Sequence, residues 1–583
     1  MEFISPFVQP MICDFIKGLT GGGCDPVIPS YDPTLWLNNM GQINSPTPST
    51  TKTNTRTSTA TAFDHEGIVV TGEPGEFMLD GGRPERNLAT SLTTHSIAVE
   101  VGRTYQISCE GANASTVVLS NAATGTLPNN GVDRLAFNTA KTAATNTLTL
   151  TVTGALTSLQ VQDVTGRSNT APSEHILATT DHGSGVNGVK WYPYANGNTV
   201  LNNVVTEAPG TAITPAPQVL MQPQRTNLIK WSRDLTNAAW SGAPLVAKTE
   251  IGLDGASNTA TLVTDNSTSA LQFLTQAHQV AATSAAHAYR VFIRKESHEK
   301  LCGVAFDVSN RNGFYTFNRK TGELGAISAD ISSVIEVNDV GFWWEVISQL
   351  TSDGGNTLAR AYIVPAYGNT KGIRDNTATG SIIVGNVEFY ENKTIEQIRG
   401  TPPIFTEAAP VTVDNDLIEI ADFNNWAPTT SGIMLFAFTP SGDWAALGAE
   451  QLVYGGASAN LLFRSANDDG LKATDGTSTP SILSGHTPGT EIIASVYWDA
   501  TLNIFQIGYY EMDNTTQHWD ASPATFTTLT VAPELIIAKI LDGAVTIRGL
   551  QIFNGMPASG VDRASIEAWI EANQEAKINE RMA

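Results

Sequence analysis

Short runs in which apolar and polar residues alternate recur along most of the chain, and this period of two predicts β-strands rather than helices. In residues 62–168 the clearest runs lie at 97–101, 105–109 and 148–152, and turns that contain Gly or Asn separate them. Strands of this kind bury one face and leave the other in water. Residues 62–168 therefore predict a small antiparallel β-sandwich.

A second β-sandwich is predicted for residues 225–408. Its strands include 289–293, 361–364 and 382–389. Gly385 interrupts the last of these strands in the way that marks a β-bulge. Trp343 and Trp344 are adjacent, so a strand through them would send one indole into the core and the other to a surface.

The last region, residues 409–583, has longer apolar strands joined by short turns. These strands lie at 433–438, 492–498, 504–509 and 545–553. A terminal helix follows, with Ser559 as its cap and Ile566, Trp569 and Ile570 on one apolar face. This order resembles the concanavalin-like jelly roll of laminin-G modules and many lectins. The expected fold class is all-β, with several antiparallel sandwich or jelly-roll domains in series.

Residues 1–30 are expected to anchor the chain through a short helix that begins near Pro10 and ends at the glycines 21–23. The apolar side chains of the anchor are Phe3, Phe7, Met11, Ile12, Phe15, Ile16 and Leu19. So short a helix must have this stripe covered, either by other chains or by the first domain of its own chain. Residues 31–61 predict an extended linker and residues 169–224 an extended connector, because Ser, Thr, Pro, Asn and Gly dominate them.

Composition narrows the class of protein. With 583 residues the chain should form several domains. Only 15% of the residues are charged and 41% are hydrophobic, which fits strands and turns better than long charged helices. The net charge of −23 repels phosphate backbones, so nucleic acid is not an expected ligand. No apolar run reaches the ~18–20 residues of a membrane span, so membrane insertion is not expected.

The four cysteines, Cys13, Cys24, Cys109 and Cys302, lack the spacing of a zinc site. Cys13 and Cys24 are close enough in sequence to bridge within or between chains, and two buried thiols are the alternative. The N-terminal residues lack the basic stretch of a secretory signal, so ordinary export is not indicated.

One phrase occurs twice, as Arg86-Asn87-Leu88 and as Arg225-Thr226-Asn227-Leu228, and each copy follows an extended stretch with Gly, Pro and Glu. This repetition predicts that one kind of connector has been used twice. The second copy continues to Asn237-Ala238-Ala239-Trp240, and the first begins at Thr55-Arg56-Thr57-Ser58-Thr59-Ala60-Thr61.

With these landmarks, residues 50–410 resemble the surface fibres of tailed bacteriophages, in which similar stretches precede a β-sandwich often described as carbohydrate-binding. The resemblance implies a virion surface protein that is assembled in the host cytoplasm. It implies as partners other virion proteins of the tail, collar or capsid, and a host-surface polysaccharide.

Sugar binding needs an aromatic face beside Asp, Asn or Gln groups that bond to hydroxyls. The candidates are Asp443, Trp444, Gln517, His518 and Trp519 in the last domain, with Trp343 and Trp344 in the second sandwich. For each tryptophan, plain packing is the alternative. Asp468 and Asp469 are calcium candidates, although Asp-Asp-Gly is also a turn sequence. No catalytic motif and no cofactor site is evident.

The sequence therefore predicts a non-catalytic virion fibre that adheres to host glycan, as a tail or collar fibre would. Because each sugar contact is weak, several copies should act together, and a homotrimer is expected. A head-decorating protein is the structural alternative. A glycan depolymerase is the enzymatic alternative, and it would need a pair of carboxylates that the sequence does not single out.

Overall fold

The structure is a computed structural model of the chain. It describes residues 35–37, 43–44, 52–140, 146–182, 184–296, 301–308, 311–329, 334–355, 357–368, 370–443, 446–448, 450–455, 460–464, 470–475, 479–483, 487–511, 514–520, 524–529, 531–532, 534–554, 567–568, 570–571 and 574. The predicted anchor in residues 1–30, with Cys13 and Cys24, lies outside these residues. No helix of the described part is long and apolar enough to cross a membrane.

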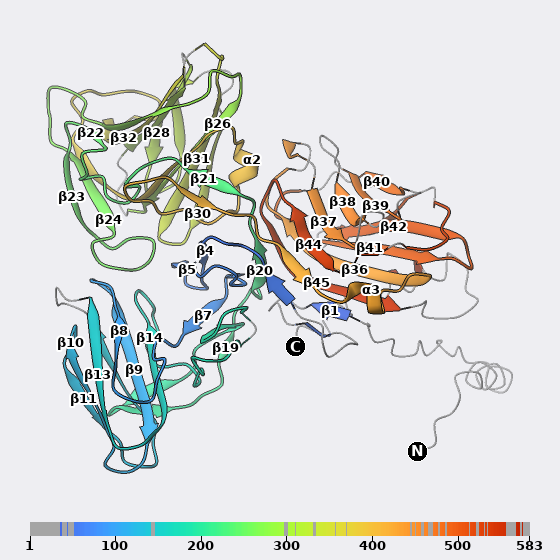
Figure 1. The fold of residues 1–583 in the computed structure, drawn as a ribbon. Coiled ribbons are helices and arrows are strands. Elements are labelled where there is room, and N and C mark those ends of the chain that lie inside the picture. The colour runs from blue at the N-terminus through green and yellow to red at the C-terminus, as the bar shows by residue number, and fades with distance from the viewer. Residues whose placement is uncertain are drawn as a thin grey trace, which may run out of the picture.

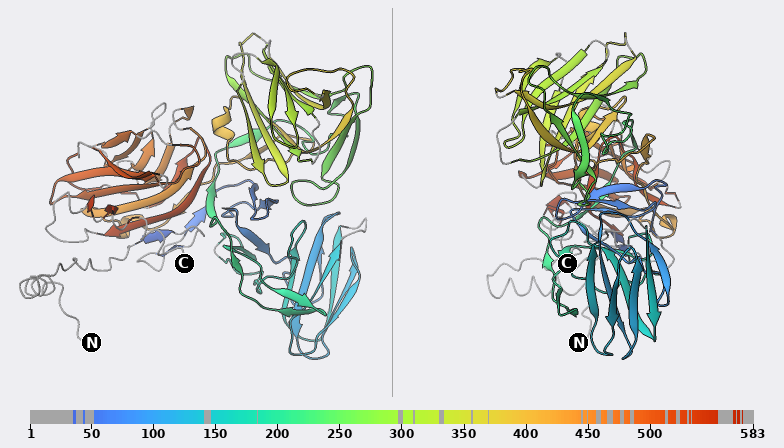
Figure 2. Two further views of the ribbon diagram at one scale, coloured as in Figure 1. Left: turned by 180° about the vertical axis from the view of Figure 1, so that it is seen from behind. Right: turned by 90° about the vertical axis from the view of Figure 1, so that its left-hand side faces the viewer.

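The protein is all-β and has three lobes that meet at a central junction (Figure 1). Each lobe is a pair of packed antiparallel sheets, as the sequence predicts. Figure 2 shows the same three lobes from behind and from the side. We call them the first sandwich, the middle sandwich and the C-terminal jelly roll.

The first sandwich packs a four-stranded sheet against a five-stranded sheet. The four-stranded order is β11 (Gly125–Pro128), β10 (Thr116–Asn121), β13 (Thr147–Thr153) and β8 (His95–Ala98). The five-stranded order is β14 (Leu156–Asp163), β9 (Thr104–Gly111), β12 (Leu135–Ala140), β18 (Val204–Thr206) and β17 (Thr199–Leu201). Since β17 and β18 lie within residues 169–224, the predicted connector supplies two strands to this sandwich.

The middle sandwich has two six-stranded sheets. One runs β22 (Ser241–Gly242), β25 (Leu274–Gln279), β32 (Leu358–Gly368), β27 (Leu301–Val308), β28 (Arg311–Asn318) and β29 (Leu324–Ala329). The other runs β23 (Leu245–Glu250), β24 (Ala260–Asp265), β33 (Gly380–Tyr390), β26 (Ala286–Arg294), β31 (Trp343–Thr351) and β30 (Val334–Val340). The pairing of β26 with β33 shifts at Gly385, which confirms the predicted bulge.

The C-terminal jelly roll takes strands from both ends of the chain. Its larger sheet runs β2 (Ile43–Asn44), β1 (Leu35–Leu37), β45 (Val545–Asn554), β36 (Ser431–Pro440), β41 (Ile492–Asp499), β42 (Ile504–Glu511) and β43 (Asn514–Trp519). Beside it, β20 (Gln218–Met221) pairs with β45 and with β6 (Leu79–Asp80).

Its second sheet has seven strands and begins with another early segment, β3. The order is β3 (Lys52–Asn54), β35 (Ile418–Ile420), β44 (Leu535–Ile540), β37 (Glu450–Tyr454), β38 (Asn460–Arg464), β39 (Gly470–Thr474) and β40 (Ser481–Leu483). Within residues 31–61, predicted to be an extended linker, the described strands β1, β2 and β3 belong to the two sheets of the jelly roll. The described residues 567, 568, 570, 571 and 574 are helical, in the region of the predicted C-terminal helix, and Ile570 is fully buried against the larger sheet.

Short paired strands and a helix form the junction between the lobes. They are β4 (Ala60–Phe63) with β5 (Val69–Gly72), β7 (Arg83–Arg86) with β15 (Val189–Tyr192), β16 (Tyr194–Ala195) with β19 (Thr211–Ala212), β21 (Arg225–Asn227) with β34 (Val411–Val413), and the helix α2 (Ile395–Ile398). The helix α3 (Phe423–Trp426) lies on the C-terminal jelly roll (Figure 1), where Phe423 is part of the core. At the centre of the junction the guanidinium of Arg56 and the carboxylate of Asp416 form an ion pair with side chains 0% and 1% exposed. Asp416 also accepts hydrogen bonds from Asn54 Nδ2 (3.1 Å) and the Gln222 backbone N–H (2.9 Å).

Each copy of the repeated sequence contains a buried asparagine, and the two asparagines make equivalent hydrogen bonds. The Asn87 side chain is buried, and its Nδ2 donates to the carbonyl oxygens of Leu159 (3.1 Å) and Ile176 (2.8 Å). Its Oδ1 accepts from the backbone N–H groups of Ala89 (2.9 Å) and Val161 (3.1 Å). This one amide thus ties the start of the first sandwich to strand β14 and to the chain beyond it.

Asn227 does the same in the middle sandwich. Its Nδ2 donates to the carbonyl oxygens of Val387 (3.3 Å) and Ile404 (2.9 Å), and its Oδ1 accepts from the N–H groups of Ile229 (3.0 Å) and Phe389 (3.2 Å). The two sandwiches are therefore attached in one way, as the sequence repeat predicts. By contrast, the similar stretches at 69–72 and 204–206 lie in unrelated places, in the junction and in the first sandwich.

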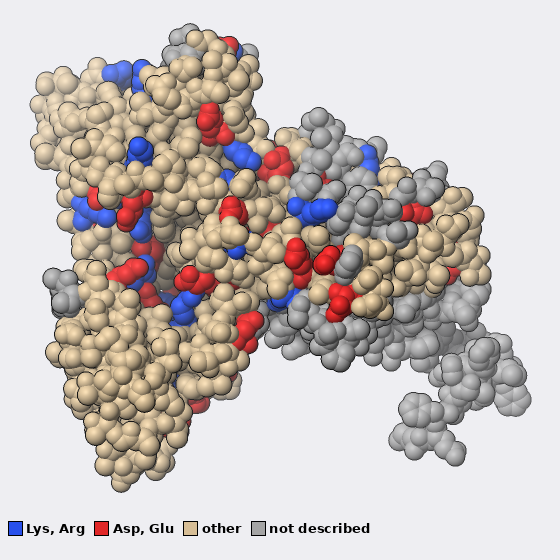
Figure 3. All heavy atoms as spheres, in the orientation of Figure 1, with Lys and Arg blue, Asp and Glu red and all other residues tan. Residues whose placement is uncertain are grey.

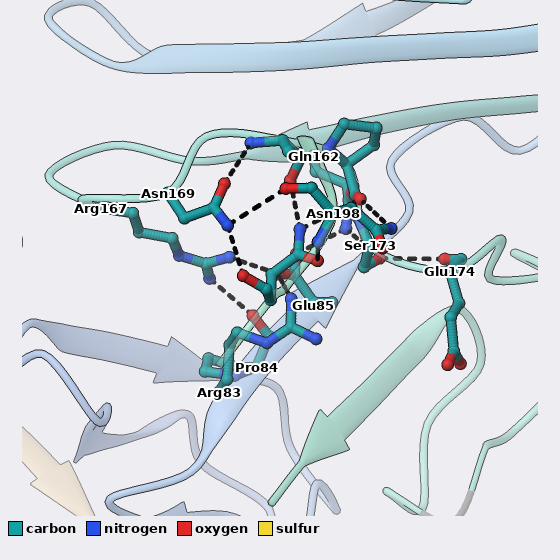
Figure 4. Close-up of polar contacts among 12 residues, drawn as sticks. Arg83, Pro84, Glu85, Gln162, Arg167, Asn169, Ser173, Glu174 and Asn198 are labelled. Atoms are coloured by element: carbon teal, nitrogen blue, oxygen red, sulfur yellow. Dashed lines mark hydrogen bonds and ion pairs between the residues drawn. The ribbon is translucent and has the colours of Figure 1, made fainter. Parts of the chain in front are cut away.

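A buried polar network covers the outer face of the five-stranded sheet of the first sandwich (Figure 4). The Glu85 carboxylate accepts from Arg83 Nη1 (2.8 Å), Arg167 Nη1 (2.7 Å) and Gln162 Nε2 (2.5 Å), and its side chain is 3% exposed. Ser173 Oγ accepts from the same Gln162 amide (2.7 Å). The chain that follows β14 is therefore fixed on this face, which leaves only the four-stranded sheet with an open face.

The buried carboxyl of Asp64, directly after β4, should make the free energy of unfolding depend on pH. Its Oδ1 accepts from the N–H groups of Glu66 and Ile68 (both 2.9 Å), and burial raises its pKa to about 6. The folded chain thus holds this proton more tightly than the unfolded chain. The free energy of unfolding should therefore fall by about 3 kcal/mol as pH rises from about 4 to about 7. Asp64→Asn should lack this fall, which urea unfolding across the same pH range would measure.

The exposed Glu407 offers a matched control for this measurement. Glu407→Gln should change the free energy of unfolding by less than about 0.5 kcal/mol at every pH. Parallel pH profiles for Asp64→Asn and the unaltered chain would contradict the assignment to Asp64.

Candidate functional site

The two sheets of the middle sandwich have different surroundings. The outer face of the β23–β30 sheet lies on the junction, where the guanidinium of Arg290 is 0% exposed and pairs with the carboxylates of Glu345 and Glu388. On the same face Ile395 of α2 packs against Ile347. The sheet that contains β22, β32 and β28 is on the opposite side, facing away from the other lobes (Figure 1, Figure 2). Its outer face is therefore the open one.

Three aromatic rings lie in a row across this open face. The Tyr362 ring centroid is 5.6 Å from that of Phe273 and 5.6 Å from that of Phe314. Ala305, opposite both Tyr362 and Phe314 in the strand register, fills the position between them with only a methyl group. The row forms because neighbours such as Ala361 and Ile363 point into the core, so the alternation turns Tyr362 outward. Phe273 is 37% exposed.

Polar groups lie beside this row. The Tyr362 hydroxyl donates to Asp307 Oδ2 (2.7 Å), and Arg360 Nη1 donates to the same oxygen (3.1 Å). Burial and this carboxylate raise the pKa of Tyr362 to about 12, so its hydroxyl stays protonated. The Oγ1 of Thr275, next to Tyr362 in the register, is buried and makes no hydrogen bond to any described residue. We call this set of Phe273, Phe314, Tyr362, Asp307 and Arg360 the aromatic face.

Such an arrangement suits a sugar chain. Aromatic rings offer apolar surfaces to the C–H groups of a pyranose, and carboxylate and guanidinium groups bond to hydroxyls. A flat sheet can hold several sugar rings in succession, whereas it encloses no small molecule. Recognition of a polymer is therefore the chemistry that this face supports.

The open face of the first sandwich is chemically different. Its outward positions on β8, β10, β11 and β13 are small or hydroxyl side chains: Ser96, Ala98, Thr116, Val118, Ser120, Thr126, Pro128, Thr147, Thr149, Thr151 and Thr153. Ser96 and Thr149 share a hydrogen bond (3.0 Å) on this face. Charged side chains gather where the lobes meet and are nearly absent from the outer part of the first sandwich (Figure 3). Of the two similar sandwiches, only the middle one carries an aromatic row on its open face.

Trp343 and Trp344 point to opposite faces of β31, as the alternation predicts. Trp343 is on the outer face, in an apolar cluster with Val69 and Phe292 at the junction, whereas Trp344 packs against the core between the two sheets. Trp343 is 5% exposed, and its ring occupies the space that a Cβ at Gly385 would need. Trp344 is half-buried, donates from Nε1 to the Arg319 carbonyl (2.7 Å), and has Lys295 Nζ 4.4 Å from its ring centroid. Neither ring belongs to the aromatic face, and sugar binding by either one stays a prediction.

Gln517, His518 and Trp519 lie on the edge strand β43, not in a turn. The ring of His518 stacks on Tyr509 at 4.7 Å, while Trp519 meets Tyr497 edge-on at 5.8 Å. Trp519 Nε1 donates to Glu571 Oε1 (2.9 Å), so this indole packs the terminal helix onto the sheet. The structure therefore supplies a packing role for Trp519, and its role in sugar binding stays a prediction.

Of the other predicted site residues, the structure describes only Asp443. The Asp443 backbone N–H donates to Glu396 Oε2 (2.7 Å), which joins the jelly roll to α2. Trp444 and the calcium candidates Asp468 and Asp469 lie outside the described residues. Among the described residues, no three His, Cys, Asp or Glu side chains are grouped closely enough to hold a metal ion.

Reactive groups are scarce among the described residues. Cys109 and Cys302 are buried, and burial raises both pKa values, to about 11 and about 12. These thiols are therefore packing groups rather than nucleophiles. Burial also raises the pKa values of four carboxyls, and none of them belongs to the aromatic face: Asp64, Asp80, Glu345 and Glu396.

The landmarks behind the fibre resemblance are structural. Arg56 and Asn227 hold the junction together, and Trp240 is 6% exposed with its Nε1 donating to the Trp231 carbonyl (3.3 Å). The sequence reasoning missed the aromatic face because no motif marks it. The only available signal was the alternation along β32, in which Arg360 and Tyr362 interrupt a run of small apolar residues.

Comparison with known proteins gives no family. No family model matches, and no curated protein matches. Among solved structures, the tandem CBM22 domains of Paenibacillus barcinonensis Xyn10C are 10% identical, with a TM-score of 0.19 over 57% of this chain and 98% of that one. A tail fibre protein of an E. coli phage is 8% identical, with a TM-score of 0.17 over 63% of this chain and 46% of that one. The ANXUR2 extracellular domain of Arabidopsis thaliana is 12% identical, with a TM-score of 0.17 over 59% of this chain and 97% of that one. At TM-scores this low, we draw no inference from these similarities. The sheets of the structure themselves define a multidomain all-β protein.

Proposed function

We propose that the protein is a non-catalytic surface fibre of a bacteriophage particle, and that it adheres to host-surface glycan through the aromatic face. The observation that carries the glycan-binding part is the row of Phe273, Tyr362 and Phe314 on an open sheet. The fibre part rests on the sequence landmarks described above. Other virion proteins would hold the chain through residues 1–30, and the protein would lie on the virion surface.

The physics of the face favours adhesion by many weak contacts. Covering about 60 Å² of ring surface contributes about 1.5 kcal/mol, so a single row binds weakly. A homotrimer would present three rows at once, and linked sites bind far more tightly than each site alone. Turnover is not part of the proposal, because the aromatic face offers only Asp307 as a carboxylate, and glycoside hydrolysis uses two.

Retention on host polysaccharide tests the proposal. The full-length chain should bind purified surface polysaccharide of the host without shortening it. Tyr362→Ala should weaken binding about tenfold, because it removes the central ring and about 1.5 kcal/mol of contact. Binding would be followed by retention on immobilised polymer, and chain length by gel filtration.

Matched variants separate the possible sites. Tyr362→Phe keeps the ring and should keep most of the binding, while Trp519→Ala tests the site predicted in the jelly roll. A loss with Trp519→Ala and none with Tyr362→Ala would move the site to the C-terminal lobe. Shortening of the polymer would make the protein a depolymerase, and no retention by the unaltered chain would remove the adhesive function.

A further inference from the structure

The charge of the aromatic face differs from that of the rest of the protein. The whole chain carries a net charge of −23, so most of its surface repels anions. On the aromatic face the one acid, Asp307, has a side chain only 15% exposed and is held by Arg360 and Tyr362. The side chain of Arg360 is 42% exposed. Its guanidinium uses Nη1 on Asp307 and also interacts with the Tyr362 side chain.

A second basic group borders the aromatic row on its other side. The loop between Gly368 and Gly380 lies on this sheet face, because the Gly372 N–H donates to Thr316 Oγ1 (2.9 Å). Lys371 Cγ would be 2.5 Å from a Cβ placed on Gly325 of β29, so its stem runs over the face while the residue stays exposed. Arg374 of the same loop is also exposed. The loop holds one acid, Asp375, whose Oδ1 accepts from the Thr377 backbone N–H (2.9 Å), so Lys371 and Arg374 leave the loop with a net positive charge.

The spacing places the aromatic row between the two basic groups. In the register, Thr316 pairs with Gly303, Phe314 with Ala305, and Asn312 with Asp307, which pairs in turn with Arg360. Two strand spacings and four residues separate the Cα positions of Thr316 and Arg360, which is about 16 Å. A polymer that crosses the rings would therefore meet the Arg360 guanidinium on one side and the Lys371 ammonium on the other.

From this geometry we infer that the glycan bound at the aromatic face is acidic and carries carboxylate groups. The inference rests on the proposed function and names its class of ligand. Carboxylates fit the planar fork of a guanidinium, and exposed pairs of this kind contribute about 1 kcal/mol each. Charge complementarity also restricts adhesion to this one face, because an acidic polymer is repelled elsewhere on the chain.

Chemical reduction of the ligand tests the inference. The probes are host-surface polysaccharide and the same preparation after its carboxylates have been reduced to alcohols. The full-length chain should retain the native polymer at least about fivefold better than the reduced one at low salt. Arg360→Gln and Lys371→Gln should each lower retention of the native polymer about fivefold and leave retention of the reduced polymer unchanged.

Lys248→Gln is the matched control, because Lys248 lies on β23 of the other sheet, where its ammonium pairs with Asp234. It should change neither retention. Equal retention of both polymers by the unaltered chain would contradict the inference that the ligand is acidic, but it would still support the proposed adhesion to glycan. Loss of retention of both polymers in Arg360→Gln would show that Arg360 acts by supporting the face and not by binding carboxylate. Absence of retention of either polymer would overturn both proposals.

Discussion

Replacing Asn227 with Ala should lower the free energy of unfolding of the middle sandwich by at least about 4 kcal/mol. The side chain is 0% exposed and makes four hydrogen bonds to backbone groups. Its loss leaves two buried N–H groups and two buried carbonyl groups without this partner, at about 1–3 kcal/mol each. Calorimetry or urea unfolding would show the transition of this lobe shifted or absent.

Two further variants sharpen this prediction. Asn227→Asp keeps the shape and the accepting oxygen but loses the two donated bonds, so it should also be strongly destabilising. Asn266 is exposed in the same sandwich, and Asn266→Ala should change stability by less than about 0.5 kcal/mol. Asn87→Ala should act on the first sandwich as Asn227→Ala acts on the middle one. A small effect at Asn227 would show that strand packing, not the amide, holds the module closed.

The second large effect concerns the jelly roll. A fragment of residues 411–583 should fail to fold cooperatively, because β1, β3 and β20 are missing from its sheets. Without β1 and β20, long parts of one edge of β45 have no partner, and without β3 the edge of β35 is open. Exposed strand edges favour aggregation. Limited proteolysis and circular dichroism of the fragment beside the full-length chain would measure the loss.

A fragment of residues 225–413 is the control, since it keeps Asn227 and the pairing of β21 with β34. It should resist proteolysis and unfold in one transition. If both fragments were equally resistant, the early strands would be additions to a complete jelly roll. For the same reason, binding measurements need the full-length chain.

The local sequence pattern was sufficient to predict a strand wherever that strand buries one face within its own lobe. The alternation around β9, β26 and β41 predicts their strands, and the Trp343-Trp344 pair predicts its own two environments. Gly385 similarly predicts the bulge in β33, because a residue without a side chain leaves room for the ring of Trp343. In each case the information lies within a few residues.

The remaining structure depends on partners far along the chain. Lys52 to Asn54 show no apolar alternation and become β3 only because β35 offers an open edge. The aromatic face could not be predicted from the sequence for a related reason. The alternation of β32 turns Tyr362 outward, but only the packing of the opposite sheet on the junction decides which outer face stays open. The packing of Trp519 on Tyr497 of β41 could not be predicted either, because the local sequence does not reveal which strands are neighbours.

The pairing of both chain ends in one lobe also constrains the order of folding during synthesis. The strands β1 and β3 leave the ribosome first, but their partners β45 and β35 follow after hundreds of residues. The first and middle sandwiches have their own cores and closing strands, so each can fold while the chain is still growing. The early strands lack these partners until β35 and β45 have been synthesised. Closure of the jelly roll is therefore the last and slowest step, and a chain cut short by failed translation would keep two folded sandwiches and an open third lobe.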